Sequence, residues 1–335
     1  MKTRRHKLAV LWTLLVLLLA TPLLIGGQPT LAALTNLHFD WLLLFALLLV
    51  ARVYFLGARF WLLFHAQGIR PGRLRTLAIV LASDFAAEAT PASAGGPITL
   101  LGLFQKAGIT VSTTLATGAT VLVMDIAAVA SIITISLLTL LAGAALPQTS
   151  TSVGILGFAL GMFLLVWLTV IYRHFLIKRL EQLALYRHLP ARHRATVKTH
   201  YTKLLQSLGQ MDQLPAITLL IVYLYALINW GIRFSILFVA LLANHQHPDW
   251  AITALIQFIS TLAGMASLLP AGFPVADTSI SALLAPHMAT ATIMAVLLLW
   301  RLMGFYFNFL AGGLAFLWLS VGKTHNTDTP ADNQI

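Results

Sequence analysis

Several charged residues lie inside long apolar stretches of this chain, where a charge is energetically unfavourable. A charged side chain costs about 2.5–3.5 kcal/mol at the centre of a membrane helix, so such residues pair with one another or serve a function. The carboxylates concerned are Asp84, Glu88, Asp125 and Asp277, and the guanidinium groups are Arg233 and Arg301. Arginine could bind an anion, and a carboxylate could carry a coupling proton. The alternative is that arginine and carboxylate form ion pairs that only hold the helices together.

The carboxylates Asp84 and Glu88 precede a stretch that should break a helix. It reads "ATPASAGGPITLLGLFQKAGI" and contains Pro91, Gly95, Gly96 and Pro97. The glycines allow positive φ and a close backbone approach, while the prolines stop one helix and start the next. The free N–H groups of the second helix would form an anion site. The alternative is a tight turn that only packs against its neighbours.

A second stretch, "LLPAGFPVAD", has the same pattern of an apolar arm, a break and a short second arm. Aligning Pro270 with Pro91 places "LPAGFPVADTSISAL" over "TPASAGGPITLLGLF", with Gly272 in the second break. A long apolar span follows each unit, and an odd number of spans separates them. The second unit is therefore inverted relative to the first, and inverted repeats with broken helices at the bilayer midplane are typical of transporters.

The composition indicates that these residues belong to a membrane protein and not to a soluble one. The 335 residues are 59% hydrophobic and 9% charged, which leaves too little charge for the surface of a soluble domain. The net charge of +11 is explained by a basic cytoplasmic face and not by nucleic-acid binding, because no nucleic-acid module is present. Without cysteine, and with histidines in surface loops, the sequence predicts no metal site and no cofactor.

Several apolar runs are long enough to cross the bilayer as helices. We predict an all-α polytopic membrane protein with six full transmembrane helices at residues 8–25, 41–58, 112–141, 155–172, 214–242 and 290–319. The first run exceeds the core of a signal peptide, so we expect the chain to retain it. We interpret Arg52 and Arg59 as long side chains that reach the inner surface.

The positive-inside rule decides what residues 76–106 do. Each arm of this segment is too short to span alone, and only a return to the cytoplasm places every basic loop on one side. We therefore predict two re-entrant helical hairpins, 76–106 and 251–286, in inverted repeats, with both termini inside. Residues 1–322 would form the transmembrane domain, with a cytoplasmic basic loop at 173–212 and a polar tail at 323–335.

Three stretches resemble the flippase-like family, which is the transmembrane domain of lysylphosphatidylglycerol synthases and its stand-alone relatives. The first break resembles the family's "TP-small-small-GG-P" block, "LLPAGFPVADTSISALL" its second block, and "LLLWRLMGFYFNFLAGG" its arginine-containing helix. Pro274 and Asp277 stand where the family commonly has glycine and glutamate. The site residues that the resemblance implies are Pro91, Gly95, Gly96, Pro97, Pro270, Gly272, Asp277 and Arg301.

The resemblance implies that the protein moves lipids, or lipid-linked molecules, between leaflets. We expect flipping or scrambling of an anionic or zwitterionic phospholipid, with the hairpins and Arg301 forming the polar path. The fused relatives carry a C-terminal aminoacyl transferase, but this chain ends soon after Lys323, so we expect no enzyme activity. A bacterial inner-membrane location is expected, and a lipid-modifying enzyme or a second copy of the chain is left open as a partner.

Two other functions remain open at this stage. An ion- or proton-coupled transporter of a small solute would use the same hairpins around a cavity closed to lipid. A non-transporting membrane subunit of a lipid- or glycan-modifying enzyme would need neither hairpin for transport. An intramembrane enzyme is the least favoured function, because the sequence shows no nucleophile–base or metal constellation.

Overall fold

The computed structural model describes residues 27–142, apart from 29, 31, 33 and 36, and residues 214–321. Within these ranges the chain is helical and contains no strand. The helices are α2 (Phe39–Ala66), α3 (Arg73–Glu88), η1 (Pro91–Ser93), α4 (Gly95–Lys106), α5 (Val111–Ala142), α9 (Ala216–Ala243), α10 (Trp250–Ala266), η3 (Pro270–Gly272), α11 (Val275–Leu284), α12 (Thr290–Arg301), η4 (Leu302–Tyr306) and α13 (Phe307–Val321).

Four of these helices are long and apolar enough to cross a membrane. They run over Asp40–Ala66, Val111–Leu140, Ala216–Ala243 and Thr290–Ser320. Each matches a predicted span, which confirms the class of an all-helical protein with membrane-spanning helices. The predicted spans 8–25 and 155–172, the basic loop 173–212 and the tail 323–335 lie outside the described residues.

The first of these helices is longer than predicted. We expected it to end near residue 58, but α2 continues to Ala66 because the residues after Arg59 are almost all apolar. Gly68, two residues after the helix end, has φ +79 and donates its N–H to the His65 carbonyl. Glycine ends helices in this way because it adopts the left-handed conformation without strain. The added turns place Arg52 near the middle of α2.

The last span is continuous but locally widened. α12 ends at Arg301, the five residues of η4 form a π-helix, and α13 continues the same rod. Short π-helical segments within an α-helix are rare and frequently occur at functional sites. The π-helical turn therefore indicates a candidate functional site around Arg301.

The first predicted break is present, and it differs in detail from the prediction. Ser83 Oγ of α3 donates a hydrogen bond of 2.8 Å to the Gly96 carbonyl of α4, so the two helices pack closely. A Cβ on Gly96 would lie 2.8 Å from the Ala87 Cβ, which confirms the expected close approach. The expected positive φ is wrong for Gly95 and Gly96, because it falls on Ser93, with φ 55.

Proline also acts differently from the prediction at this break. Pro91 begins η1, so it does follow the end of a helix. Pro97, however, does not start the next helix, because α4 already begins at Gly95. It stands in the first turn of α4, where its missing N–H leaves no helical hydrogen bond unmade.

The second break repeats part of the local structure of the first. η3 begins at Pro270 as η1 begins at Pro91, and the aligned residues Ser93 and Gly272 both have positive φ, 55 and 66. Gly272 is required because a Cβ there would lie 2.9 Å from the Gly264 Cα. Both aligned prolines therefore begin a short 3₁₀ turn, but the second break differs in the further positive φ of Ala271 and in the extended residue Phe273 that ends η3.

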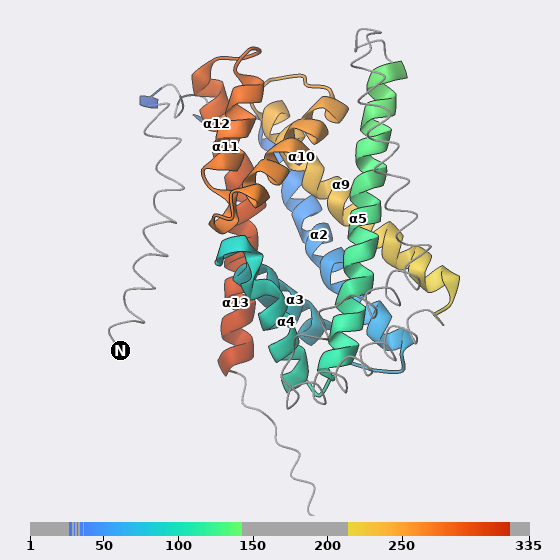
Figure 1. Ribbon diagram of the computed structural model, residues 1–335. Helices are drawn as coiled ribbons and strands as arrows, with labels where there is room; N and C mark the ends of the chain where they lie inside the picture. Colours follow the sequence, from blue (N-terminus) through green and yellow to red (C-terminus); the bar gives the residue numbers. More distant parts are fainter. Residues whose placement is uncertain are drawn as a thin grey trace, which may run out of the picture.

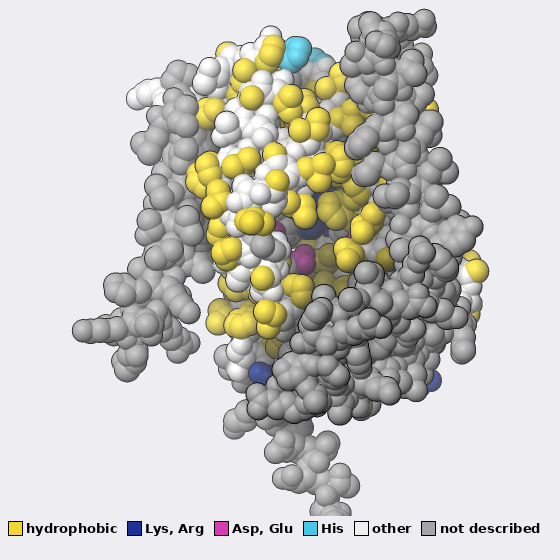
Figure 2. Space-filling view, in the orientation of Figure 1, with side chains coloured by type: hydrophobic (Ala, Val, Ile, Leu, Met, Phe, Trp, Pro, Cys, Tyr) yellow, Lys and Arg dark blue, Asp and Glu magenta, His cyan; other side chains and the backbone are white. Residues whose placement is uncertain are grey.

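The two breaks contact each other. In Figure 1, α3 and α4 lie in the lower half and α10 and α11 in the upper half, and η1 contacts η3 between them. α3 also packs tightly on α13, where a Cβ on Gly312 would lie 2.4 Å from the Leu81 carbonyl oxygen. On the face shown in Figure 2, hydrophobic side chains predominate among the described side chains, as expected for helices that face lipid.

Candidate functional site

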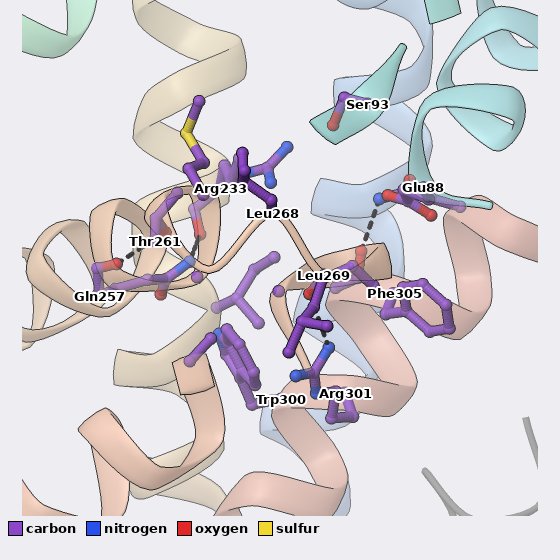
Figure 3. A pocket seen from close by; sticks show the side chains of 18 of the residues that line it. Glu88, Ser93, Arg233, Gln257, Thr261, Leu268, Leu269, Trp300, Arg301 and Phe305 are labelled. Atoms are coloured by element: carbon purple, nitrogen blue, oxygen red, sulfur yellow. Dashed lines mark hydrogen bonds between the residues drawn. The ribbon is translucent and has the colours of Figure 1, made fainter. Parts of the chain in front are cut away.

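A cavity of about 390 Å³ lies where the two breaks face α2, α9 and the last span. Its polar wall is contributed by several different elements. Figure 3 shows Glu88 and Ser93 on one side, Arg233 and Gln257 on the opposite side, and Arg301 beside Trp300. Because no single element contains the site, it depends on the meeting of both breaks.

The exposed rim of the cavity is mainly apolar, with Ser93 as its one polar residue among the described lining residues. Met265 and Leu268 line it and are 69% and 62% exposed, and Leu269 is exposed as well. Figure 2 shows basic and acidic side chains at the bottom of a hollow that hydrophobic side chains surround. A polar interior next to an apolar, exposed rim suits a molecule with a polar head and apolar tails.

Arg301 holds the second break against α12. Its Nε donates a hydrogen bond of 2.8 Å to Asp277 Oδ1, and its Nη2 pairs with the other carboxylate oxygen. Nη1 lies 3.5 Å from the Ala271 carbonyl oxygen, and the guanidinium group lies over the Trp300 ring. The structure thus brings Asp277, in the first turn of α11, and Arg301 together. Because Asp277 and the Ala271 carbonyl already contact its guanidinium group, Arg301 is held in place as part of the cavity wall.

A second buried ion pair joins Arg59 of α2 to Asp125 of α5. Arg59 is only 2% exposed, so the interpretation that it reaches the inner surface is wrong. Neither residue lines the cavity. The pair joins Arg59 Nη1 to Asp125 Oδ1, so Asp125 links α5 to α2 and is not placed at the cavity.

Arg52 lines the cavity from the middle of α2. Arg52 is also only 2% exposed, so the interpretation that it reaches the inner surface is wrong. Its Nη1 donates a hydrogen bond of 2.7 Å to Asn308 Oδ1. Asn308 in turn donates to the Gly304 carbonyl within the widened turn of the last span. Arg52 is therefore a site residue that the sequence reasoning missed, and its central position in a long helix was the signal.

Arg233 reaches the cavity from α9, and its backbone is held by a side chain of α10. Gln257 Nε2 donates to the Arg233 carbonyl at 2.7 Å, and Gln257 Oε1 accepts from the Leu237 N–H at 3.2 Å. These two backbone groups are the partners of one helical turn, so the buried amide bridges that turn of α9. The Arg233 guanidinium lies 5.1 Å from the Trp230 ring centre.

Glu88 and Asp84 share one face of α3, as predicted. Glu88 lines the cavity, whereas Asp84 lies one turn behind it. Both carboxylates interact electrostatically with Arg52 and Arg233. Glu88 Oε2 is buried and has no hydrogen-bond partner among the described residues. Burying an oxygen without a hydrogen bond costs free energy, so Glu88 is a candidate to bind a ligand or a proton.

The predicted site residues divide into two groups in the structure. Those that line the cavity are Glu88, Arg233, Gly272 and Arg301. Those that shape the breaks or lie behind the wall are Asp84, Pro91, Gly95, Gly96, Pro97, Asp125, Pro270 and Asp277. The described residues hold no cluster of three metal-ligating side chains.

The fold and the site together define a class: an integral membrane protein whose broken helices enclose buried ionic groups. The chain belongs to the family described as the lysylphosphatidylglycerol synthase transmembrane region, whose model matches residues 7–312. This match confirms the resemblance seen in the two breaks and the arginine-containing helix. Comparison of the chain with curated proteins finds no match.

Proposed function

We propose that the protein moves a phospholipid, or another lipid-linked amphiphile, between the two leaflets of a membrane. The observation that carries this proposal is the cavity: its interior is ionic, and its rim at Met265, Leu268 and Leu269 is apolar and exposed. A headgroup can occupy the interior while the acyl chains stay in the bilayer. Membership of a lipid-related membrane family supports the same function.

In this proposal the two broken segments are re-entrant hairpins that enter from opposite sides. α3 and α4 are each shorter than a full span, and so are α10 and α11. Together with the runs at 8–25 and 155–172, the four long helices make six full spans with both termini in the cytoplasm. The two units are then inverted repeats, and their breaks form the headgroup site near the midplane.

The proposed activity is transport without a chemical reaction. In this proposal the protein is therefore a transporter and not an enzyme. Its partners are anionic or zwitterionic membrane lipids in a bacterial inner membrane. A lipid-modifying enzyme that supplies the substrate, and a second copy of the chain, are further partners that fit this function. Nucleic acid is not among them.

A transporter of a small anionic solute is the second candidate. The observation that favours it is the arginine-rich interior, because guanidinium groups bind a soluble anion as readily as a lipid phosphate. The two candidates differ in what the exposed apolar rim is for. Only lipid transport needs a passage that opens sideways to the acyl chains.

Leaflet exchange in reconstituted vesicles tests the proposal. Phospholipids with a fluorescent headgroup or chain label are placed in both leaflets, and dithionite quenches those in the outer leaflet. We expect quenching beyond the outer-leaflet fraction in vesicles with the protein and none in protein-free vesicles. Vesicles that exchange no phospholipid of any headgroup class, yet take up a labelled small anion, would support the second candidate instead.

A further inference from the structure

The ionic groups of the membrane interior differ in whether another part of the protein already binds them. Among the described residues the ion pairs are Arg59 with Asp125 and Arg301 with Asp277. Arg52 and Arg233 line the cavity and belong to neither pair. Arg52 Nη1 donates to an amide oxygen, while Arg52 Nε is buried and has no hydrogen-bond partner among the described residues. These two guanidinium groups therefore retain capacity for an anion.

When Glu88 and Asp84 are both ionised, the charge around these arginines is balanced before any ligand binds. The groups that face Glu88 are Asp84 on α3, Arg52 on α2, Arg233 on α9 and Arg301 on α12, the last already paired. Two unpaired arginines thus stand against two carboxylates. A phosphate monoanion bound to both arginines would leave one uncompensated negative charge in a buried site, which is strongly unfavourable.

One group can remove that excess without moving any helix. Glu88 lines the cavity, and its Oε2 has no hydrogen-bond partner among the described side chains and backbone groups. A protonated carboxyl would become a donor and could face a phosphate oxygen, whereas an ionised one would repel it. Asp84 does not line the cavity, so it cannot contact the ligand in the same way.

We infer that Arg52 and Arg233 bind the phosphate of the lipid headgroup and that Glu88 takes up one proton as the phosphate binds. The inference rests on the proposed lipid transport and adds to it the charge of the ligand and a coupled ion. The balance is simple: one O–H bond forms on Glu88, with the proton drawn from water. The lipid then crosses together with a proton, which makes transport sensitive to a pH difference across the membrane.

Binding of phosphatidylglycerol to the purified full-length protein tests this coupling. The probe is fluorescently labelled phosphatidylglycerol, titrated over about pH 6 to 9, a range in which its phosphodiester does not change charge. Because each bound lipid brings one proton with it, the affinity should fall by up to about tenfold per pH unit as the pH rises. Glu88→Gln should bind with an affinity that does not depend on pH.

Matched variants separate the roles of the residues. Arg52→Gln and Arg233→Gln should each weaken binding about tenfold or more at every pH, because a charge-assisted phosphate contact is lost. Arg75→Gln removes an exposed arginine of α3 and should change nothing. Asp84→Asn should keep the dependence on pH. Labelled diacylglycerol, which lacks the phosphate, should not bind to the site.

Several results would overturn the inference. One is a pH-independent affinity of the unmodified protein, and another is a pH dependence that survives in Glu88→Gln but disappears in Asp84→Asn. Dimethyl phosphate that binds as tightly as phosphatidylglycerol would refute a lipid as the source of the phosphate. If leaflet exchange persists while binding ignores pH, only the coupling is wrong. If neither binding nor exchange occurs, the proposed function itself is wrong.

Discussion

At the scale of single residues, the buried charges have two different tasks. Arg59 with Asp125, and Arg301 with Asp277, are closed pairs that join helices, and Arg301 also holds the carbonyl of the second break. Arg52 lines a cavity without a carboxylate partner in the described structure. The first task predicts effects on stability, and the second predicts effects on ligand binding.

Breaking the closed pair behind the cavity should destabilise the protein. Asp125→Asn leaves the buried Arg59 guanidinium without a counter-charge, which should lower the free energy of unfolding by about 3 kcal/mol. Thermal unfolding in detergent measures the change. The matched control is Asp40→Asn, which removes an exposed carboxylate. Equal melting temperatures for the two variants would contradict a structural role for the pair.

The pair at the second break should tolerate a longer carboxylate but not a neutral one. Asp277→Glu can still accept from two guanidinium nitrogens, whereas Asp277→Asn loses the charge and one acceptor. We expect near-normal leaflet exchange for the first variant and a loss of about tenfold or more for the second. Similar rates for both would show that the ion pair does not position this break.

At the scale of elements, the helices are close enough in places to exclude a single methyl group. Gly312 of α13 lies against α3, where an added Cβ would be 2.4 Å from the Leu81 carbonyl oxygen and 2.7 Å from the Phe85 Cβ. The neighbouring Gly313 has room, since its nearest contact would be 3.6 Å away. α3 therefore packs closely on the last span around Gly312.

Substitution at these two glycines tests that contact. Gly312→Ala should force α3 and α13 apart and reduce stability by about 1–3 kcal/mol, the usual cost of overpacking. Gly313→Ala should be neutral or slightly stabilising, because alanine has the higher helix propensity. The melting temperatures of the two variants give the answer. A larger loss in Gly313→Ala would mean that the two helices do not pack as described.

The topology of the hairpins is open to a direct test, because the chain contains no cysteine. Cysteine placed at Thr110 should react from the cytoplasm, and at Gln246 from the opposite side. Thr196, which lies outside the described residues, should report the same side as Thr110. Impermeant thiol reagents applied to right-side-out and inverted vesicles distinguish the sides. Thr110 and Thr196 on opposite sides would rule out a first hairpin that returns to the cytoplasm.

The sequence predicts the breaks well because their causes are local. Proline and glycine act on the backbone where they stand, so the helices around Pro91 and Pro270 end close to the predicted positions. Arg52 could not be assigned in the same way, because its partner Asn308 is distant in the chain. The bridge from Gln257 to the backbone of α9, and the π-helical turn after Arg301, likewise depend on tertiary packing.

At the scale of the whole molecule, the site exists only because two distant halves of the chain meet. η1 and η3 touch, and each belongs to a segment that arrives from its own end of the bundle (Figure 1). The cavity walls come from both halves, with Glu88 from one and Arg233 and Arg301 from the other. Under the proposed lipid transport, we expect the two breaks to separate or to shift relative to each other when a headgroup passes.

Identifying the molecule that occupies the cavity in intact membranes tests the proposed headgroup site. A diazirine amino acid at Thr261, which lines the cavity, is activated in intact membranes and the adduct is identified by mass spectrometry. The same label at Leu262, which is 49% exposed, samples bulk lipid. We predict a phospholipid adduct at both positions, and its loss at Thr261 alone in the double variant Arg52→Gln, Arg233→Gln. An adduct at Leu262 with no lipid at Thr261 in the unmodified background would contradict a headgroup site at the meeting of the two breaks.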